Sequence, residues 1–275
     1  MKVGLGSWTY GWAIGVGGFP APKQPLTALD ILSRARDYGL AVVQIADNLP
    51  VDELSPSALA ELGTRAREWN IELEIGTVGV QPRHLLRYLE LAKRLGAKLV
   101  RSLVSAVGSR ADLGQARAWL KEALPAFESA GVCLALENYE GNASRALAAL
   151  VRDAASPCLG ICLDTVNSLG AMETPAMVVA ELAPYVRSLH IKDFEIARVE
   201  SRMGFVVSGR PAGEGLLDVD WLLAEIRRAG QEPNLILELW TPYQGTVEET
   251  IRLEAEWAER SVRFLKRTAC RCLQE

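Results

Sequence analysis

The sequence has 275 residues, of which 49% are hydrophobic and 23% are charged, so the chain can bury a large core as a soluble globular protein does. Its 30 Lys and Arg against 34 Asp and Glu give a net charge of −4, which excludes the basic surface of proteins that bind nucleic acid or anionic membranes. The sequence shows neither a signal-peptide pattern nor an uninterrupted apolar stretch of about 18 residues, so we expect a cytoplasmic protein.

Eight apolar, β-branched runs are expected to be strands, because strands that are buried on both faces are nearly continuous hydrophobic runs. In chain order they are residues 2–8, 41–47, 71–77, 98–104, 132–138, 159–165, 186–193 and 235–240.

Between these runs lie segments with apolar residues at helical spacing, several of which close on a glycine. They include residues 27–39, 55–70, 82–96, 115–131 and 218–230. Eight alternations without a linker favour one (β/α)8 TIM barrel spanning residues 1–275. A doubly wound dinucleotide-binding sheet fits less well, because Gly4 and Gly6 lack the third glycine of that fingerprint. Residues 194–219 are expected to form a long loop over the barrel mouth.

Four consecutive predicted strands each carry an ionisable side chain near the carboxyl end, which is where TIM barrels place their catalytic groups. These side chains are Glu137, Asp164, His190 and Glu238. Taken singly, Asp164 could cap a turn, Glu137 could pair with Arg101, and His190 could be a core histidine. Taken together, three carboxylates and one imidazole need a cationic partner, because burying uncompensated charge is very costly. We therefore predict a divalent metal site; these oxygen and nitrogen ligands favour Mn²⁺, Mg²⁺ or Co²⁺ and also suit Zn²⁺.

The strings LENYEG, LDTVN, HIKD and GRPAGEG, which carry these residues in order along the chain, resemble the xylose isomerase-like TIM barrel superfamily. Within it the chain is similar to the sugar phosphate isomerase/epimerase family, which includes ketose 3-epimerases, hydroxypyruvate isomerase and inosose dehydratase. The resemblance implies that the same four residues bind the metal, and that Arg210, in the segment 210–215, binds substrate.

One position departs from this family. Many members have Asp-x-x-His where this chain has Asp164-Thr165-Val166-Asn167, and in the family that histidine contacts substrate beside the metal. Asn167 can still hydrogen-bond a hydroxyl of the substrate, but it cannot exchange a proton near neutral pH. The departure leaves the metal site intact and puts the particular reaction in doubt.

The chemistry that these residues allow is removal of a proton next to a carbonyl, giving an enediolate that a metal stabilises. On the ketose 3-epimerase pattern, Glu137 and Glu238 act as base and acid on opposite faces of the substrate, so we expect an isomerase or epimerase acting on a ketose. A lyase or dehydratase acting on a keto-inositol, a 3-keto sugar or a glycoside would share the first step. A barrel that only binds a sugar remains a further alternative. An apurinic endonuclease is disfavoured, because the chain has only two histidines.

Aromatic residues after the first and eighth strands, notably Trp8 and Trp240, favour a pocket for a small carbohydrate. Arg101 and Lys192 are further candidates for contacts with substrate, although Lys192 could instead form a solvated or structural salt bridge and Trp8 could simply pack in the barrel. Asp47 could bind a hydroxyl or start a turn. The sequence has no P-loop, which favours a substrate without phosphate. The long charged segment 247–267 could close the barrel or join two copies of the chain in a homo-oligomer.

The five cysteines show no zinc-binding spacing. We expect reduced thiols at Cys133, Cys158 and Cys162, and an exposed pair, Cys270 and Cys272, near the carboxyl end.

Overall fold

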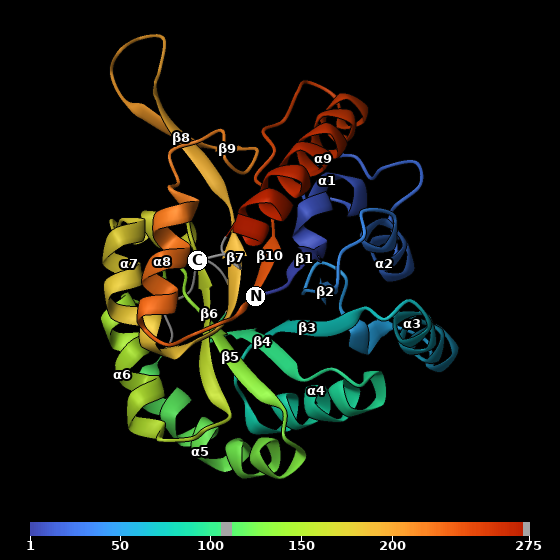
Figure 1. The fold of residues 1–275 in the computed structure, drawn as a ribbon, viewed down its shortest axis with the longest axis vertical. Helices are drawn as coiled ribbons and strands as arrows, with labels where there is room; N and C mark the ends of the chain where they lie inside the picture. Colours follow the sequence, from blue (N-terminus) through green and yellow to red (C-terminus); the bar gives the residue numbers. More distant parts are fainter. Residues whose placement is uncertain (106–111, 272–275) are drawn as a thin grey trace.

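The chain folds into a closed barrel of eight parallel strands surrounded by helices, as the computed structural model shows for residues 1–105 and 112–271 (Figure 1). Around the barrel, each strand is hydrogen-bonded to the next, and β1 closes the ring by pairing with both β10 and β2. The eight strands, in barrel order, are β1 (Val3–Gly6), β10 (Asn234–Leu237), β7 (Val186–Ile191), β6 (Leu159–Asp164), β5 (Cys133–Glu137), β4 (Leu99–Leu103), β3 (Glu72–Val78) and β2 (Val42–Ile45). The predicted (β/α)8 fold is confirmed, and each strand lies within a predicted run or within one residue of it.

The helices occupy the segments between these strands. The α-helices are α1 (Gly11–Ile14), α2 (Ala28–Asp37), α3 (Pro56–Glu68), α4 (Pro82–Leu95), α5 (Leu113–Ala130), α6 (Ser144–Ala154), α7 (Pro175–Leu182), α8 (Val219–Arg228) and α9 (Val247–Arg271). Short 3₁₀ helices are η1 (Ser7–Tyr10), η2 (Val51–Glu53), η3 (Asn167–Ala171) and η4 (Ala183–Tyr185).

Local chemistry explains where several of these helices begin and end. Thr27 and Asp30 form a reciprocal capping box at the start of α2, and the Ser55 hydroxyl accepts a hydrogen bond from the Ala58 amide at the start of α3. Gly96 ends α4 with a φ of 74°, a left-handed conformation that glycine adopts without steric cost. The helix boundaries are therefore fixed largely by short-range interactions that the sequence encodes directly.

One part of the fold differs from the prediction. The sequence predicts a loop over residues 194–219, but residues 194–210 of this segment belong to an antiparallel hairpin formed by β8 (Asp193–Arg198) and β9 (Phe205–Arg210). The hairpin extends away from the barrel beside α9 (Figure 1). Several apolar residues of the hairpin are exposed, so its sequence lacks the regular alternation of apolar and polar residues that predicts a half-buried strand.

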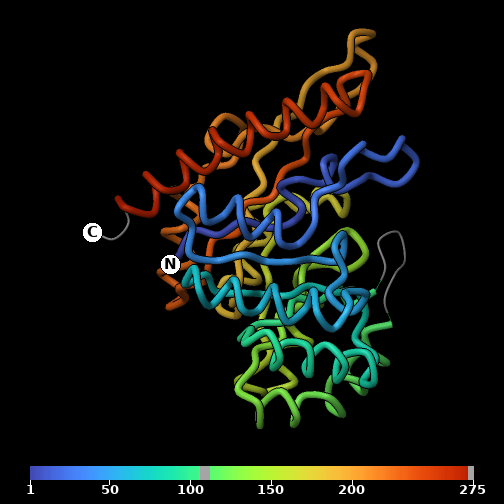
Figure 2. The backbone as a smooth tube through the Cα atoms, turned by 90° about the vertical axis from the view of Figure 1, so that its right-hand side faces the viewer, coloured from blue at the N-terminus to red at the C-terminus, as the bar shows by residue number. Residues whose placement is uncertain are grey.

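Apolar side chains of the strands and of the surrounding helices pack into the main core, while buried polar side chains, among them Gln44, Glu74, Ser188 and His190, are hydrogen-bonded to one another across the barrel. Figure 2 shows the N-terminus and the end of α9 on one side of the barrel and the turn after α1 on the opposite side. Strands β5, β6, β7 and β10 run parallel, so their carboxyl ends lie at the same end of the barrel, which we call the mouth.

Two further sequence predictions concern thiols and membranes. Cys162 is buried, Cys133 and Cys158 are half-buried, Cys270 is exposed, and all four are free thiols. Cys272 lies outside the described residues. Among the helices that the structure describes, none is long and apolar enough to span a bilayer.

Candidate active site

The four predicted metal ligands converge at the barrel mouth, and all four are fully buried. Glu137 and Asp164 are the last residues of β5 and β6, His190 lies on β7, and Glu238 directly follows β10. The Nδ1 atom of His190 lies 3.6 Å from Glu137 Oε1, 3.6 Å from Asp164 Oδ2 and 3.4 Å from Glu238 Oε2. The structure thus brings together the four predicted metal ligands.

These atoms fit a shared divalent cation better than they fit direct hydrogen bonds with one another. His190 Nδ1, Asp164 Oδ2 and both Glu238 oxygens are buried without a hydrogen-bond partner among the described residues. Ligand atoms that bind a cation at about 2.1 Å lie roughly 3.0–3.4 Å from one another, which is close to the separations here. Unpartnered buried polar atoms are costly, so an ion among them would satisfy the whole group.

Asp164 serves two roles at once. Its Oδ1 accepts hydrogen bonds from the backbone amides of Val166, at 2.9 Å, and Asn167, at 2.8 Å, which fixes the turn after β6. Its Oδ2 points toward His190 instead. The interpretation of Asp164 as a turn cap is therefore confirmed through Oδ1, and its role as a metal ligand through Oδ2 stays a prediction.

Lys192 supplies a cation inside this cluster. Its Nζ lies 2.8 Å from Asp164 Oδ2 and 2.8 Å from Glu238 Oε2, as ion pairs without hydrogen-bond angles. Burial by itself would lower the pKa of Lys192, but the charges of Asp164 and Glu238 outweigh it and raise the pKa above the usual value. Lys192 is thus an ammonium with a proton held at the mouth of the barrel.

Glu137 is held by cationic and amide donors on its other side. The Arg101 Nε donates to Glu137 Oε2, Arg101 NH1 lies 2.6 Å from Asp47 Oδ1, and Asn167 Nδ2 donates to Glu137 Oε1 at 2.8 Å. Burial would raise the pKa of Glu137, but Arg101 and then His190 outweigh it and lower the pKa to about 2. Glu137 therefore stays ionised and is a very weak base in this arrangement.

The burial of His190 would lower its pKa, but the Cys162 sulfur and the charges of Glu238 and Glu137 raise it well above the usual value. Either a proton on His190 or a divalent cation among these ligands would offset the negative charge of the carboxylates. Around the site four carboxylates face two cationic side chains, which leaves a formal charge of −2 with a neutral imidazole. These groups are Asp47, Glu137, Asp164 and Glu238 against Arg101 and Lys192.

A pocket of about 460 Å³ opens above the cluster. Its lining includes the predicted substrate contacts Trp8, Arg101, Asn167, Lys192 and Trp240, together with Asp47, Leu103, Glu137, Tyr139, Glu140 and Gly170. Trp240 is 41% exposed, and its ring centroid lies 5.7 Å from Lys192 Nζ. The pocket is large enough for a small sugar-sized molecule and presents aromatic, cationic and amide groups to it.

The segment after β1, which carries Trp8, is held by contacts with the segment after β10 and with α9. Trp12 stacks on Tyr243 with ring centroids 5.4 Å apart, and its indole N–H donates to the Thr241 carbonyl at 2.7 Å. The buried carboxylate of Glu254, on α9, accepts the backbone amides of Trp12 at 2.9 Å and Ala13 at 3.0 Å. These contacts join the segments after β1 and β10, which carry the two tryptophans of the pocket.

Arg210 does not line this pocket. Its guanidinium pairs with Glu195 Oε2 at 2.7 Å on the β8–β9 hairpin. The glycine-rich segment after it has a structural role instead: the amides of Gly213, Gly215 and Leu217 all donate to the Asp193 carboxylate at 2.9–3.0 Å. A Cβ at residue 215 would lie 2.2 Å from Asp193 Oδ1, so only glycine fits there. The substrate role of Arg210 stays a prediction.

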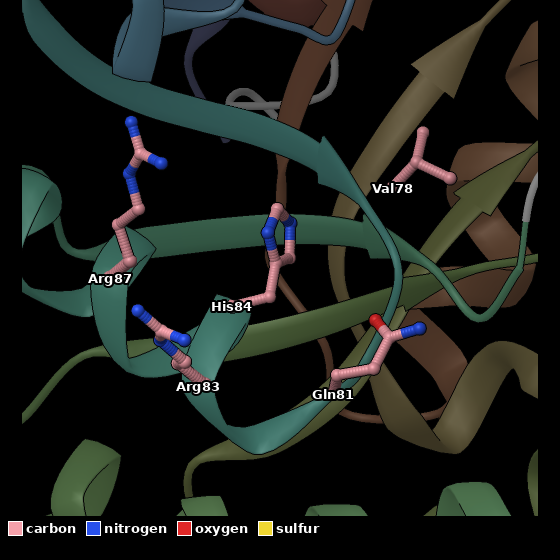
Figure 3. A pocket seen from close by; sticks show the side chains of 5 residues that line it. All are labelled: Val78, Gln81, Arg83, His84 and Arg87. Atoms are coloured by element: carbon pink, nitrogen blue, oxygen red, sulfur yellow. The ribbon is translucent and has the colours of Figure 1, made fainter.

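A second pocket, also of about 460 Å³, lies beside the start of α4 (Figure 3). It is lined by Val78, Gln81, Arg83, His84 and Arg87. The His84 Nε2 is hydrogen-bonded to the Thr77 hydroxyl at 2.7 Å, and Figure 3 shows its ring lying between the side chains of Arg87 and Gln81. None of the predicted site residues lies in this pocket.

Sequence reasoning missed the residue that holds His190 from below. Gln44, on β2, places its Oε1 2.7 Å from His190 Nε2, and its own amide donates to Glu74 Oε2 at 2.8 Å. The sequence does contain a signal for this contact: Gln44 and Glu74 are polar residues within mainly apolar runs, and they occupy paired positions of β2 and β3. Their partner on β7 could not be read from the sequence.

Comparisons with known proteins agree with the fold. The family model for the xylose isomerase-like TIM barrel matches residues 32–268. A 3-oxo-isoapionate decarboxylase from Pectobacterium atrosepticum is 38% identical over 265 residues, which cover 96% of this chain and 95% of that protein.

Solved structures share the fold at lower identity. A D-psicose 3-epimerase structure determined in the presence of D-fructose aligns with a TM-score of 0.71 at 15% identity, covering 97% of each chain. A xylose isomerase-like TIM barrel protein from Mycobacterium smegmatis, in complex with magnesium, aligns with a TM-score of 0.70 at 16% identity, covering 95% of this chain and 97% of that one. The chain therefore belongs to the xylose isomerase-like TIM barrel family.

Proposed function

We propose that the protein is a metal-dependent lyase that decarboxylates a 3-oxo acid derived from a sugar. The single observation that carries this proposal is the state of Glu137. Arg101 and Asn167 hold both of its oxygens, and its pKa is about 2. A reaction that needs two carboxylate bases on opposite faces of the substrate is poorly served by such a group.

Decarboxylation of a 3-oxo acid needs no base to remove a proton from carbon. It needs a polarised carbonyl to accept electrons and an acid to supply one proton. A divalent cation held by Glu137, Asp164, His190 and Glu238 would act as a Lewis acid on the substrate carbonyl. The ligand atoms of these residues that lack hydrogen bonds support this assignment.

The chain's own residues would carry the remaining steps. The bond between the carboxyl carbon and its neighbour breaks, its electron pair moves toward the carbonyl to give an enolate, and carbon dioxide leaves. The proton on Lys192 Nζ then passes to the carbon that lost the carboxyl group, and Lys192 regains a proton from water. Lys192 lines the pocket as an ammonium. Asp164 and Glu238 raise its pKa, and a cation bound to these two carboxylates would weaken their hold on its proton.

The other pocket residues would hold and orient the substrate. Asn167 can accept a hydrogen bond from a hydroxyl through its amide oxygen while its amide nitrogen holds Glu137. Trp8 and Trp240 offer apolar faces to the carbon skeleton. The relative from Pectobacterium, which is named as a 3-oxo-isoapionate decarboxylase and matches along almost the full length of both chains, supports this substrate class.

Isomerisation or epimerisation of a ketose is the second candidate. It is favoured by Glu238, whose Oε1 is buried in the site without a hydrogen-bond partner among the described residues and could remove a proton. With Glu137 engaged by Arg101, this route would run with one base and a proton returned by Lys192.

The two candidates give different products in one experiment. Protein loaded with Mg²⁺, Mn²⁺, Co²⁺ or Zn²⁺ is incubated in D₂O with a panel of 3-oxo sugar acids and, separately, with ketoses. The proposal expects release of carbon dioxide from an acid with one deuterium entering the product. This reaction should be about 10²–10⁴-fold slower in Lys192→Met and unchanged in the surface control Lys121→Met. Deuterium exchange into a ketose without carbon dioxide from any acid would reject decarboxylation in favour of the second candidate.

A further inference from the structure

His190 is hydrogen-bonded to Gln44, and Gln44 is hydrogen-bonded in turn to the buried carboxylate of Glu74, which lies outside the cluster of predicted metal ligands. Glu74, on β3, is 1% exposed and accepts three hydrogen bonds: from Gln44 Nε2 at 2.8 Å, from the Ser188 hydroxyl at 3.1 Å and from Asn234 Nδ2 at 2.8 Å. A buried carboxyl group with so complete a set of donors is held in a fixed orientation, although burial raises its pKa.

The side-chain amide of Gln44 has two ends of nearly equal size, and its orientation depends on its neighbours. A carboxylate can only accept hydrogen bonds, so Glu74 turns the NH₂ end of Gln44 toward itself. Were Glu74 protonated, it could donate to the Ser188 hydroxyl and still accept from Gln44. In either state the Oε1 of Gln44 faces His190.

The orientation of Gln44 then decides which nitrogen of His190 carries the hydrogen. Gln44 Oε1 lies 2.7 Å from His190 Nε2 and is an acceptor, so Nε2 must carry the hydrogen. In a neutral ring the other nitrogen, Nδ1, then has a free lone pair. Nδ1 is the atom that lies 3.4–3.6 Å from the three carboxylates.

We propose that Glu74 is a positioning residue for the metal site: acting through Gln44, it fixes His190 with a hydrogen on Nε2 and a lone pair on Nδ1 aimed at the cation. The inference rests on the metal site of the proposed function. Glu74 is on the opposite side of Gln44 from His190 and contacts neither the ligands nor the pocket. Outer-shell partners of metal-binding histidines typically change metal affinity by about 10–100-fold.

The chain offers a matched control on the same strand. Glu72 lies two residues before Glu74 and also accepts a hydrogen bond from Asn234, at 3.2 Å, but it has no contact with Gln44 and pairs with Lys2 near the surface. Glu74→Gln leaves residue 74 with one acceptor oxygen for two amide donors, so Gln44 is free to reverse. Glu72→Gln makes the same chemical change on a side chain that forms no hydrogen bond with Gln44 among the described residues, and it leaves the Gln44–Glu74 hydrogen bond in place.

The experiment measures Zn²⁺ affinity by calorimetry and the His190 ring by ¹⁵N NMR in both variants. The chain has only two histidines, so a His84→Gln variant assigns the ring signals. We expect Glu74→Gln to lose about 10–100-fold in Zn²⁺ affinity and to exchange its His190 Nε2 hydrogen faster, while Glu72→Gln matches wild type. Gln44→Met, which removes the acceptor at similar volume, should show both effects even if Glu74→Gln folds poorly.

Wild-type affinity together with a wild-type Nε2 hydrogen in Glu74→Gln and in Gln44→Met would overturn the proposal. Failure of the wild-type protein to bind any divalent ion would instead overturn the metal site of the proposed function. In that case the Nε2 hydrogen of the metal-free protein still tests the path: slow exchange in wild type that is lost in Gln44→Met supports it, and equal exchange rejects it.

Discussion

Replacing Lys192 with methionine removes the ammonium that lies 2.8 Å from both Asp164 and Glu238. Each contact is strong, about 6 kcal/mol by Coulomb's law at an effective dielectric of about 20, but desolvation offsets much of it. Removing one partner of a buried ion pair typically costs about 3–5 kcal/mol, because the remaining charge is left without compensation. We take this range as the expected loss of stability in the metal-free protein.

The melting temperature is the first readout. At about 2.1 cal/mol/K per residue, unfolding of a chain this long has an entropy of roughly 0.6 kcal/mol/K, so the expected loss lowers the melting temperature by about 5–9 °C. Saturating divalent ion should recover much of this loss, because the ion offers Asp164 and Glu238 another cation. If Lys192→Met melts at the wild-type temperature without metal, the two ion pairs do not have the weight argued here.

The catalytic readout separates charge from proton transfer. Lys192→Met should lower the rate of product formation by about 10²–10⁴-fold, the range of general acid catalysis. Lys192→Arg keeps a positive charge but holds its proton too tightly to give it up. It should therefore be stable and slow; an active Lys192→Arg enzyme would show that charge alone is required.

Three further predictions concern other parts of the molecule. Burial raises the pKa of Glu254 to about 8, above its value in the unfolded chain, so the folded state binds more protons between about pH 4.5 and 8 and its stability falls as pH rises, by up to about 1.4 kcal/mol per pH unit. The urea midpoint of wild type should therefore fall more between pH 5.5 and 8.0 than that of Glu254→Gln, and parallel curves would contradict this. Gly215→Ala should lower the free energy of unfolding in urea by about 1–3 kcal/mol, because its Cβ would lie 2.2 Å from Asp193 Oδ1 and 2.4 Å from the Phe194 carbonyl oxygen. Gly17→Ala, with open space around it, should leave stability unchanged, and equal stability of the two variants would refute the argument. Glu238→Gln should fold normally yet take up less than one divalent ion per chain in elemental analysis, while the exposed control Glu122→Gln keeps wild-type metal content; full occupancy in Glu238→Gln would remove this residue from the ligand set.

The sequence by itself determined the eight strands and the residues that end four of them. Strand formation depends on local apolar runs, and parallel strands in a barrel must all end at one mouth, so Glu137, Asp164, His190 and Glu238 could be placed together from spacing alone. The resemblance carried by LENYEG, LDTVN and HIKD is likewise written in short continuous strings. The family model confirms it.

Only the tertiary structure decided which neighbours surround these residues. That Arg101 binds Glu137, that Lys192 spans Asp164 and Glu238, and that Gln44 lies under His190 all depend on side-chain directions across strands far apart in the chain. The hairpin at 193–210 was also hidden, because its exposed strands lack the burial that produces a periodic pattern. Local pattern fixes where an element lies, whereas the charge state and partners of a buried group are set by whatever the fold packs against it.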